Sequence, residues 1–417
     1  MSNVRSIILA AGRGTRMKSD VPKVLHQVCG RPMIEYVLDI TRSLRSLKTY
    51  CVIGHGAEKV QETVGSDVEF VLQTQLLGTA DAVRRVEPHL KGFTGTVLVL
   101  CGDTPLLSKA IVKSLLLRHQ RSKAAVTVLT AIIDQPYGYG RIIRDQHKSF
   151  LAIREQKDAN EQEDRINEIN VGVYCFESKK LFAALKKVQL NPKKKEFYLT
   201  DVIELLLGQG DKVDTLTTKD PYVAFGVNNR QDLAQAESIV RRKILDQHMI
   251  NGVTIIDPSN TYIDADVRIG TDTVVYPGTV INGNVRIGSH CKIGPFAHIR
   301  PGSRLADKVE VGNFAEVSRT SLGPNVMMKH FSFLGDAQVA AKVNIGAGTV
   351  TANYDGKNKN KTLIQEGAFI GSDSILVAPV TIGSKAVVGA GAVVTKNTKV
   401  PSGAIARGVP ARIYKHK

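Results

Sequence analysis

Long apolar runs and paired cysteines are both absent from this 417-residue chain. No apolar run reaches the roughly 18 residues that cross a bilayer. The run SIILAAG, between Arg5 and Arg13, is too short for the core of a secretory signal. We therefore expect a cytoplasmic protein with no membrane partner.

Metal-binding and disulfide patterns are missing as well. The chain has five dispersed cysteines and no CxxC pair: Cys29, Cys51, Cys101, Cys175 and Cys291. None lies at metal-ligand spacing from a histidine, and an odd, scattered set is typical of reduced, buried thiols. Neither a zinc site nor a disulfide framework is expected.

The net charge of +17 has two interpretations. Basic proteins often bind nucleic acid, but here the surplus is spread along the chain. It is accompanied by no recognition helix, aromatic RNA-binding signature or zinc finger. We expect anionic or phosphorylated small-molecule substrates and no nucleic-acid partner.

The most informative pattern present is a six-residue beat in the second half. Branched apolar residues recur at Ile263, Ile269, Val275, Ile281, Ile287, Ile293, Ile299, Leu305, Val311 and Val317, and again at Ile364, Ile370, Leu376, Ile382, Val388, Val394 and Val400. Six is a multiple of the strand period and fits a helix poorly. The pattern predicts short strands, three to an eighteen-residue coil, with each coil stacked on the next. A sandwich of alternating strands would give variable spacing instead.

This repeat resembles the left-handed parallel β-helix of the hexapeptide acyltransferases, and the resemblance supplies the handedness. We expect that fold over 251–417. Residues 1–227 alternate apolar runs with amphipathic stretches, which predicts an α/β domain with a Rossmann-like, mainly parallel mixed sheet. Residues 228–250 change to helical periodicity, with Asn228 or Asn229 as the cap and Asn251-Gly252 as the stop.

A glycine-rich segment, LAAGRGTRMKSDVPKVL, follows the first expected strand. Its small residues let backbone N–H groups approach an anion, and its basic side chains add charge: Arg13, Arg16 and Lys23. It matches neither the Walker A loop nor a full GxGxxG fingerprint. Taken alone, it could equally be a tight turn.

Further polar residues follow in a characteristic order: Gln73, Asp103, Gly140, Glu155, Asn170 and Asn228. With the loop, they resemble the sugar-1-phosphate nucleotidyltransferases. Together with the β-helix, the match narrows to the bifunctional bacterial enzymes that make UDP-N-acetylglucosamine. The resemblance covers nearly the whole chain.

That resemblance implies an N-terminal site for UTP, N-acetylglucosamine-1-phosphate and Mg²⁺. Arg16 and Lys23 would stabilise the triphosphate and the charge that develops at the α-phosphorus. The nucleotide would contact Leu9, Ala10, Ala11, Gly12, Gln73, Gly78, Thr79 and Cys101, with Gln73 and Gly78 at the uracil. The metal would be held by Asp103 and Asn228, and the acetamido sugar by Gly140, Glu155 and Asn170.

A second site is implied where the six-residue beat is interrupted, between Val317 and Ile364. The resemblance assigns His330 as the base for N-acetylation of glucosamine-1-phosphate by acetyl-CoA, a role that suits a side chain titrating near neutral pH. The amino-sugar phosphate would contact Arg300, Ser318, Phe333 and Asn344, and acetyl-CoA would contact Asn353, Tyr354, Lys359, Ser372, Ala390 and Arg407. Sites of this fold lie between neighbouring β-helices, which implies a homotrimer.

Two residues depart from the family pattern, with Ser318 in place of a second phosphate-binding lysine and Phe333 in place of a tyrosine. Eighteen-residue coils predict that Arg300 and Ser318 stack in one column on adjacent coils, about 4.8 Å apart. Arg319 would replace the missing charge only through a local bulge. The ending ARGVPAR is also closer to generic hexapeptide acyltransferases. The acetyl acceptor therefore stays open.

Two alternatives remain. One is a nucleotidyltransferase whose β-helix is structural or acetylates a different amino-sugar phosphate. The other is a non-catalytic assembly scaffold, which would not need Arg16, Lys23, Asp103 and Asn228 together.

Overall fold

The computed structural model describes residues 3–44, 46, 48–192 and 195–415. The chain divides into two compact units, Met1–Glu237 and Ser238–Lys417. The point of division lies within helix α8 (Arg230–Ile250). In the described residues, no helix combines the length and the apolar character that a bilayer crossing requires.

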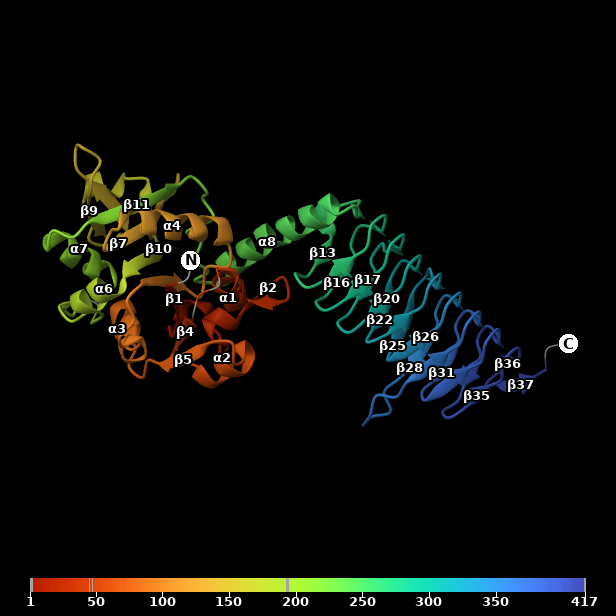
Figure 1. Cartoon of the computed structure of the whole chain (residues 1–417). Helices are drawn as coiled ribbons and strands as arrows, with labels where there is room; N and C mark the ends of the chain where they lie inside the picture. The colour runs from red at the N-terminus through yellow and green to blue at the C-terminus, as the bar shows by residue number, and fades with distance from the viewer. Residues whose placement is uncertain (1–2, 45, 47, 193–194, 416–417) are drawn as a thin grey trace. The chain divides into compact units, whose positions relative to one another are not determined.

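The N-terminal unit is built on a nine-stranded mixed sheet (Figure 1). Its strands are β1 (Val4–Ala10), β4 (Lys48–Ile53), β5 (Glu69–Leu72), β6 (Thr96–Cys101), β7 (Val126–Ile132), β8 (Arg141–Arg144), β9 (Phe150–Arg154), β10 (Glu168–Glu177) and β11 (Val213–Thr218). The order is β11-β7-β10-β6-β1-β4-β5, with β8 and β9 paired beside β10. β10 runs antiparallel to β6 and β7, so the sheet is less parallel than alternating strands and helices predict.

Helices cover both faces of this sheet. They are α1 (Met33–Ser43), α2 (Ala57–Val64), α3 (Thr79–Arg84), α4 (Lys109–Ser122), α5 (Glu161–Asp164), α6 (Ser178–Leu185) and α7 (Thr200–Gly208). Neighbouring residues of β1 enter different cores: Ile7 packs with side chains of α3, α6 and α7, and Ile8 with side chains of α1, α2 and α4. A central strand buried on both faces explains why its sequence is almost continuously apolar.

A small hairpin, β2 (Gln27–Val28) with β3 (Arg31–Pro32), precedes α1. At the other end of the unit, the predicted cap of α8 is present. Asn229 Oδ1 accepts from the Asp232 N–H (2.9 Å), and Asp232 Oδ2 accepts from the Asn229 N–H (3.2 Å). Gly252, with φ +91°, follows the last turn. The reciprocal hydrogen bonds between Asn229 and Asp232 form a capping box, which explains where the helix begins.

The second unit is a parallel β-helix of three sheets (Figure 1). The β12 sheet contains β12 (Thr254–Ile255), β15 (Val274–Val275), β18 (Lys292–Ile293), β21 (Glu310–Val311), β24 (Met327–Met328), β27 (Asn344–Ile345), β30 (Phe369–Ile370), β33 (Val387–Val388), β36 (Ile405–Arg407) and β37 (Arg412–Tyr414). The β13 sheet contains β13 (Tyr262–Ile263), β16 (Val280–Ile281), β19 (His298–Ile299), β22 (Ala315–Ser318), β25 (Ser332–Gly335), β28 (Val350–Ala352), β31 (Ile375–Val377) and β34 (Val393–Val394).

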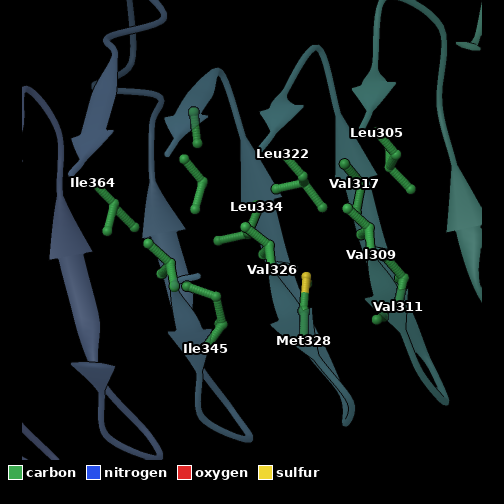
Figure 2. Close-up of a cluster of buried hydrophobic side chains, with 14 of the residues drawn as sticks. Leu305, Val309, Val311, Val317, Leu322, Val326, Met328, Leu334, Ile345 and Ile364 are labelled. Carbon is green, nitrogen blue, oxygen red and sulfur yellow. The ribbon is translucent and has the colours of Figure 1, made fainter. Parts of the chain in front are cut away.

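The third, β14 sheet contains β14 (Arg268–Ile269), β17 (Arg286–Ile287), β20 (Arg304–Leu305), β23 (Ser321–Leu322), β26 (Ala337–Val339), β29 (Thr362–Ile364), β32 (Val380–Ile382) and β35 (Lys399–Val400). The residues of the six-residue beat point inward and form one continuous core. Figure 2 shows this arrangement for side chains including Leu305, Val311 and Val317. The strand prediction is confirmed.

The interruption after Val317 is not a break in the β-helix. Paired residues are eighteen apart up to Ile299↔Val317, seventeen apart from Arg304↔Ser321 to Phe333↔Val350, and twenty-five apart at Asn344↔Phe369. Two coils are therefore one residue shorter, and a loop is inserted between β28 and β29. Leu322, Met328, Leu334 and Ile345 continue the core through this region (Figure 2).

Close stacking of coils makes a specific stability prediction. A Cβ at Gly312 would overlap the Lys329 backbone carbonyl on the next coil, whereas a Cβ at Gly283 would make only ordinary contacts, 3.7 Å or more from Asp264. Gly312→Ala should therefore destabilise the β-helix by about 1–3 kcal/mol, the usual cost of overpacking. Gly283→Ala should be close to neutral. Urea unfolding followed by circular dichroism measures both, and equal midpoints would contradict the close coil contact.

Candidate active sites

A cavity of about 600 Å³ opens at the carboxyl ends of β1, β5 and β6. Ten residues predicted for the nucleotide site line it: Leu9, Ala10, Ala11, Gly12, Lys23, Gln73, Gly78, Thr79, Cys101 and Asp103. Loops at the carboxyl ends of parallel strands are where open α/β sheets bind ligands. The structure thus brings together segments that are far apart in the sequence.

Charged and amide groups meet at one side of this cavity. The Lys23 ammonium forms an ion pair with Asp103, and it also donates to Asn228 Oδ1 (3.1 Å). Arg16 Nη2 donates to the same oxygen (2.9 Å). The Val227 N–H donates to the Asp103 carbonyl (3.0 Å), which ties the segment before α8 to the end of β6. Four predicted residues therefore form one cluster.

Local backbone geometry lets Lys23 reach this position. Gly14 has φ +60°, and a Cβ there would lie 2.7 Å from Lys23 Cβ. Both the left-handed conformation and the close approach favour glycine. Gly14 precedes the 3₁₀ turn Thr15–Met17, which carries Arg16, and Lys23 opens the turn Lys23–Leu25. The conformation of the glycine-rich segment thus brings the side chains of Arg16 and Lys23 to one side of the cavity.

The cluster fits a divalent metal. Asp103 and Asn228 direct oxygen atoms at a single cation, the Lys23 ammonium. Hard oxygen donors that converge on one point suit Mg²⁺, which commonly takes only one or two protein ligands beside phosphates and water. The described residues contain no group of three or more His, Cys, Asp or Glu side chains placed to hold a metal. A dedicated all-protein metal cage is thus not seen in that part of the chain.

Gln73 and Cys101 form neutral parts of the cavity wall. The Gln73 amide donates to the Gly78 carbonyl (3.1 Å) and to Asp81 Oδ2 (2.9 Å), which fixes its orientation. Burial raises the pKa of the Cys101 thiol to about 12. Cys101 therefore stays protonated near neutral pH and acts as a packing residue.

The three residues predicted for the acetamido sugar lie together. The Asn170 N–H donates to the Gly140 carbonyl (2.8 Å), and a Cβ at Gly140 would lie 3.6 Å from Glu155 Oε1. Asn170 Oδ1 accepts from the Gly172 N–H (3.1 Å), and the Cys101 thiol contacts the Gly172 carbonyl. This group is linked to the cavity wall through Cys101.

Sequence reasoning missed Glu196 and Tyr198, which also line the cavity. Backbone bonds hold their segment in place: the Phe197 N–H donates to the Leu77 carbonyl (2.7 Å), and the Ala80 N–H to the Phe197 carbonyl (2.9 Å). Such pairing across more than a hundred residues leaves no periodic signal in the sequence. The nucleotide cavity therefore has a wall that motifs alone do not reveal.

The predicted acetyl-transfer residues lie on the β-helix surface. His330 is exposed just before β25, and Phe333 of β25 pairs in register with Glu316 and Val350. Arg300 forms an ion pair with Glu316 (2.8 Å). Asn344 opens β27 and is partly exposed. His330 and Phe333 thus lie at β25, Arg300 follows β19 of the same sheet, and Asn344 lies on the β12 sheet.

Arg300 and Ser318 lie in one column, as the eighteen-residue coil predicts, but they do not face the same surface. The two residues do lie on adjacent coils, since the Arg300 N–H donates to the Val317 carbonyl (2.8 Å). However, Ser318 is only 1 % exposed, whereas Arg300 is exposed. Strand β22 ends at Ser318, so its hydroxyl is turned into the corner and cannot share an open surface with Arg300.

Arg319 takes the position over Ser318. Its φ is +50°, so it departs from the strand geometry that would face it away. Arg319 Nη1 donates to Ser318 Oγ (2.9 Å), and Nε and Nη2 hold both oxygens of Asp336 (2.7 and 2.8 Å). This arginine lowers the pKa of Asp336, which also accepts a bond from the Asn353 amide. Arg319 thus reaches Ser318 from a left-handed corner after β22 and not through the expected bulge.

The residues predicted for acetyl-CoA extend from this corner along later coils. Tyr354 is 60 % exposed on the inserted loop, where it pairs with Lys359. Ser372 and Ala390 occupy the same corner of adjacent coils, since the Gly391 N–H donates to the Ser372 carbonyl (2.8 Å). Arg407, on the next coil, lies over the Tyr414 ring (4.6 Å). Lys359, Ser372, Ala390 and Arg407 are also exposed, whereas Asn353, the sixth residue predicted for acetyl-CoA, is only 8 % exposed.

Comparison with known proteins identifies the class of each domain. Residues 6–195 match the MobA-like NTP transferase domain. Residues 284–319 and 361–396 match the bacterial transferase hexapeptide, six repeats. The cavity and the coils thus belong to a nucleotidyltransferase domain joined to a hexapeptide transferase domain, whose β-helix is of the left-handed class.

Full-length relatives make the identification specific. Bifunctional protein GlmU of Geobacillus thermodenitrificans is 46 % identical over 98 % of this chain and 96 % of its own length. The corresponding proteins of Bacillus cytotoxicus and Bacillus subtilis are 48 % and 45 % identical, over 97 % and 96 % of this chain and 95 % of their own lengths. The chain belongs to the family of bifunctional GlmU proteins.

Proposed function

We propose that this chain makes UDP-N-acetylglucosamine in two steps. The β-helix domain transfers the acetyl group of acetyl-CoA to glucosamine-1-phosphate. The N-terminal domain then transfers uridyl from UTP to N-acetylglucosamine-1-phosphate and releases pyrophosphate. The observation that carries the proposal is the cluster of Arg16, Lys23, Asp103 and Asn228 at the edge of a nucleotide-sized cavity. Both cosubstrates are cytoplasmic metabolites, and we place the enzyme there.

The uridyl step needs no covalent enzyme intermediate. A phosphate oxygen of the sugar phosphate attacks the α-phosphorus of UTP, the bond to the β-phosphate oxygen breaks, and pyrophosphate leaves. Protein catalysis of such a transfer consists of positioning and charge neutralisation. Lys23, which lines the cavity, and Arg16 both donate to Asn228 Oδ1, and they would supply positive charge where the negative charge develops.

Asp103 and Asn228 would hold Mg²⁺ in this site. When bound, the metal would supply positive charge that neutralises part of the phosphate charge. In the chain alone, Lys23 pairs with the same two side chains. With Mg²⁺ held by Asp103 and Asn228, Lys23 would direct its charge to the phosphates.

Two groups of residues would orient the substrates: the uncharged wall of the cavity and the Gly140, Glu155 and Asn170 group beside it. The nucleotide would contact the backbone segment that contains Leu9, Ala10, Ala11 and Gly12. The uracil would face the amide of Gln73, whose orientation is fixed, together with Gly78 and Thr79. Gly140, Glu155 and Asn170 would hold the acetamido sugar beside Cys101. Polar groups held in place by their own hydrogen bonds lose little freedom when a ligand binds.

The acetyl step uses the exposed His330. The amine of glucosamine-1-phosphate attacks the thioester carbon, His330 accepts the amine proton, and CoA leaves as the thiol. Arg300 would face the sugar phosphate, with Phe333 and Asn344 beside the sugar. Acetyl-CoA would lie along Asn353, Tyr354, Lys359, Ser372, Ala390 and Arg407. Tyr354, Lys359, Ser372, Ala390 and Arg407 are exposed, which supports this path along the later coils, whereas Asn353 is only 8 % exposed.

Arg319 supports glucosamine-1-phosphate as the acceptor despite the loss of a lysine. Its guanidinium covers Ser318 and carries a charge that the serine lacks. Asp336 holds it in a fixed orientation through two hydrogen bonds. A planar guanidinium is well suited to phosphate. The competing proposal is that the chain acetylates a different amino-sugar phosphate. It is based on the same corner of the β-helix, which is less polar with Ser318 and Phe333 than with the lysine and tyrosine of the family pattern.

The exposure of the acetyl-transfer residues supports an oligomer. His330, Tyr354 and Arg407 all face solvent in one chain. A thioester transfer site works best when water is excluded, so a second copy should cover it. We propose a homotrimer in which the loop between β28 and β29 completes the site of a neighbour.

Lys23→Ala tests the first site. Removing one preorganised charge should lower uridyl transfer by roughly a hundredfold or more, with the fold intact. Lys18→Gln, which removes a charge from an exposed side chain in the same segment, is the matched control and should retain activity. Pyrophosphate release from UTP and N-acetylglucosamine-1-phosphate is the readout. A near-normal rate for Lys23→Ala would remove this residue from the mechanism.

His330→Ala and Tyr354→Ala together test the second site and the oligomer. Each variant alone should lose CoA release, the first by about 10²–10⁴-fold because it removes a general base. If His330 and Tyr354 of one site come from different chains, randomly mixed trimers should regain up to about a quarter of the wild-type activity. Equal inactivity of the mixture and its parents would show that both residues of a site belong to one chain. Unchanged turnover in His330→Ala would overturn the base assignment.

A further inference from the structure

Three arginines form a column on the β14 sheet. Arg268, Arg286 and Arg304 open β14, β17 and β20, and they pair directly in register, Arg268↔Arg286 and Arg286↔Arg304. The residue after each arginine points into the core, so the arginine side chains face outward, and all three are exposed. Strands lie about 4.8 Å apart, so the three cations are held on a rigid surface at that spacing.

These charges have no acidic partner in the part of the chain that the structure describes. Among residues 3–44, 46, 48–192 and 195–415, no hydrogen bond or ion pair is found for the three guanidinium groups. Other cations of the β-helix are paired across coils: Lys292 and Lys329 with Glu310 (3.2 and 3.0 Å), and Arg300 with Glu316 (2.8 Å). Like charges directly opposite one another destabilise a sheet. An unpaired column of three therefore costs stability that an anion would restore.

The other outward-facing residues of the β14 sheet indicate which class of anion would bind. Beyond Arg304 the column continues with Ser321, Gln338, Leu363, Thr381 and Lys399. It offers no aromatic side chain on which a nucleic-acid base could stack. Its first exposed large apolar residue, Leu363, lies three strands beyond Arg304, so no apolar anchor for a lipid surface lies beside the arginines.

Spacing also disfavours an acidic peptide. Side chains on one face of an extended peptide are about 6.6 Å apart, which does not match arginines about 4.8 Å apart. Phosphoryl groups joined by anhydride bonds are close enough for neighbouring guanidinium groups to share them. Each guanidinium can also bind a phosphoryl group through two N–H donors.

We propose that Arg268, Arg286 and Arg304 bind a compact polyphosphate, an anion with several phosphoryl groups joined by anhydride bonds. This site lies on a different sheet from His330 and in a different unit from the nucleotide cavity. It is independent of the two reactions proposed above. It accounts for part of the chain's surplus positive charge, which neither reaction uses.

Calorimetric titration of the full chain with inorganic tripolyphosphate tests this proposal. Metal-free, low-salt buffer keeps the probe unchelated, and a Lys23→Ala background removes the contribution of the nucleotide cavity. Arg286 lies at the centre of the column, so Arg286→Gln should weaken tripolyphosphate binding by at least about tenfold. Arg286→Lys should have an affinity between those of the parent and Arg286→Gln, because it keeps the charge but loses the paired N–H donors of the guanidinium. Binding should weaken as salt is added.

Lys292→Gln is the matched control, since it removes a cation from the same coil that is already paired with Glu310. It should bind tripolyphosphate within about twofold of the parent, as expected for an exposed, compensated charge. The proposal fails if Arg286→Gln and Lys292→Gln bind alike. It also fails if single-stranded oligothymidylate or vesicles of anionic lipid bind at the arginines as tightly as tripolyphosphate does.

Discussion

Backbone hydrogen bonding between successive coils is the constraint on which the second half of this molecule depends. Each short strand is too small to be stable alone, and it is held only by the coil on either side. The register of these bonds decides which side chains point inward and which form columns on the surface. It places Phe333 beside Glu316 and stacks three arginines on another face. Stability and surface chemistry therefore share one cause.

The register also explains how the β-helix accommodates a site. Two coils lose a residue and a third gains a loop, yet the core continues through Leu322, Leu334 and Ile345. Shortening the corner after β22 lets Arg319 adopt a left-handed conformation and cover Ser318. The chemistry is thus concentrated where the coil length changes, and the scaffold on either side stays regular.

Sequence periodicity predicted the strands and the inward residues well, because both follow directly from backbone geometry. Asp103, just after β6, and Lys23, in the glycine-rich segment after β1, could be singled out because polar residues after apolar runs and glycine-rich turns leave local signals, whereas their roles come from the family resemblance. The antiparallel direction of β10 and the wall formed by Glu196 and Tyr198 were not predictable. They arise from pairing between distant segments. The conformation of Arg319 was left open because it depends on a one-residue change in coil length.

The central claim is that one chain catalyses both acetyl transfer and uridyl transfer, and that Ser318 does not abolish acetyl transfer. The most direct test supplies the purified wild-type protein with glucosamine-1-phosphate, acetyl-CoA, UTP and Mg²⁺, and follows CoA and pyrophosphate together. The account predicts CoA release only with glucosamine-1-phosphate, followed by an equal amount of pyrophosphate, and pyrophosphate alone with N-acetylglucosamine-1-phosphate. Pyrophosphate from the acetylated sugar without any CoA from glucosamine-1-phosphate would contradict it.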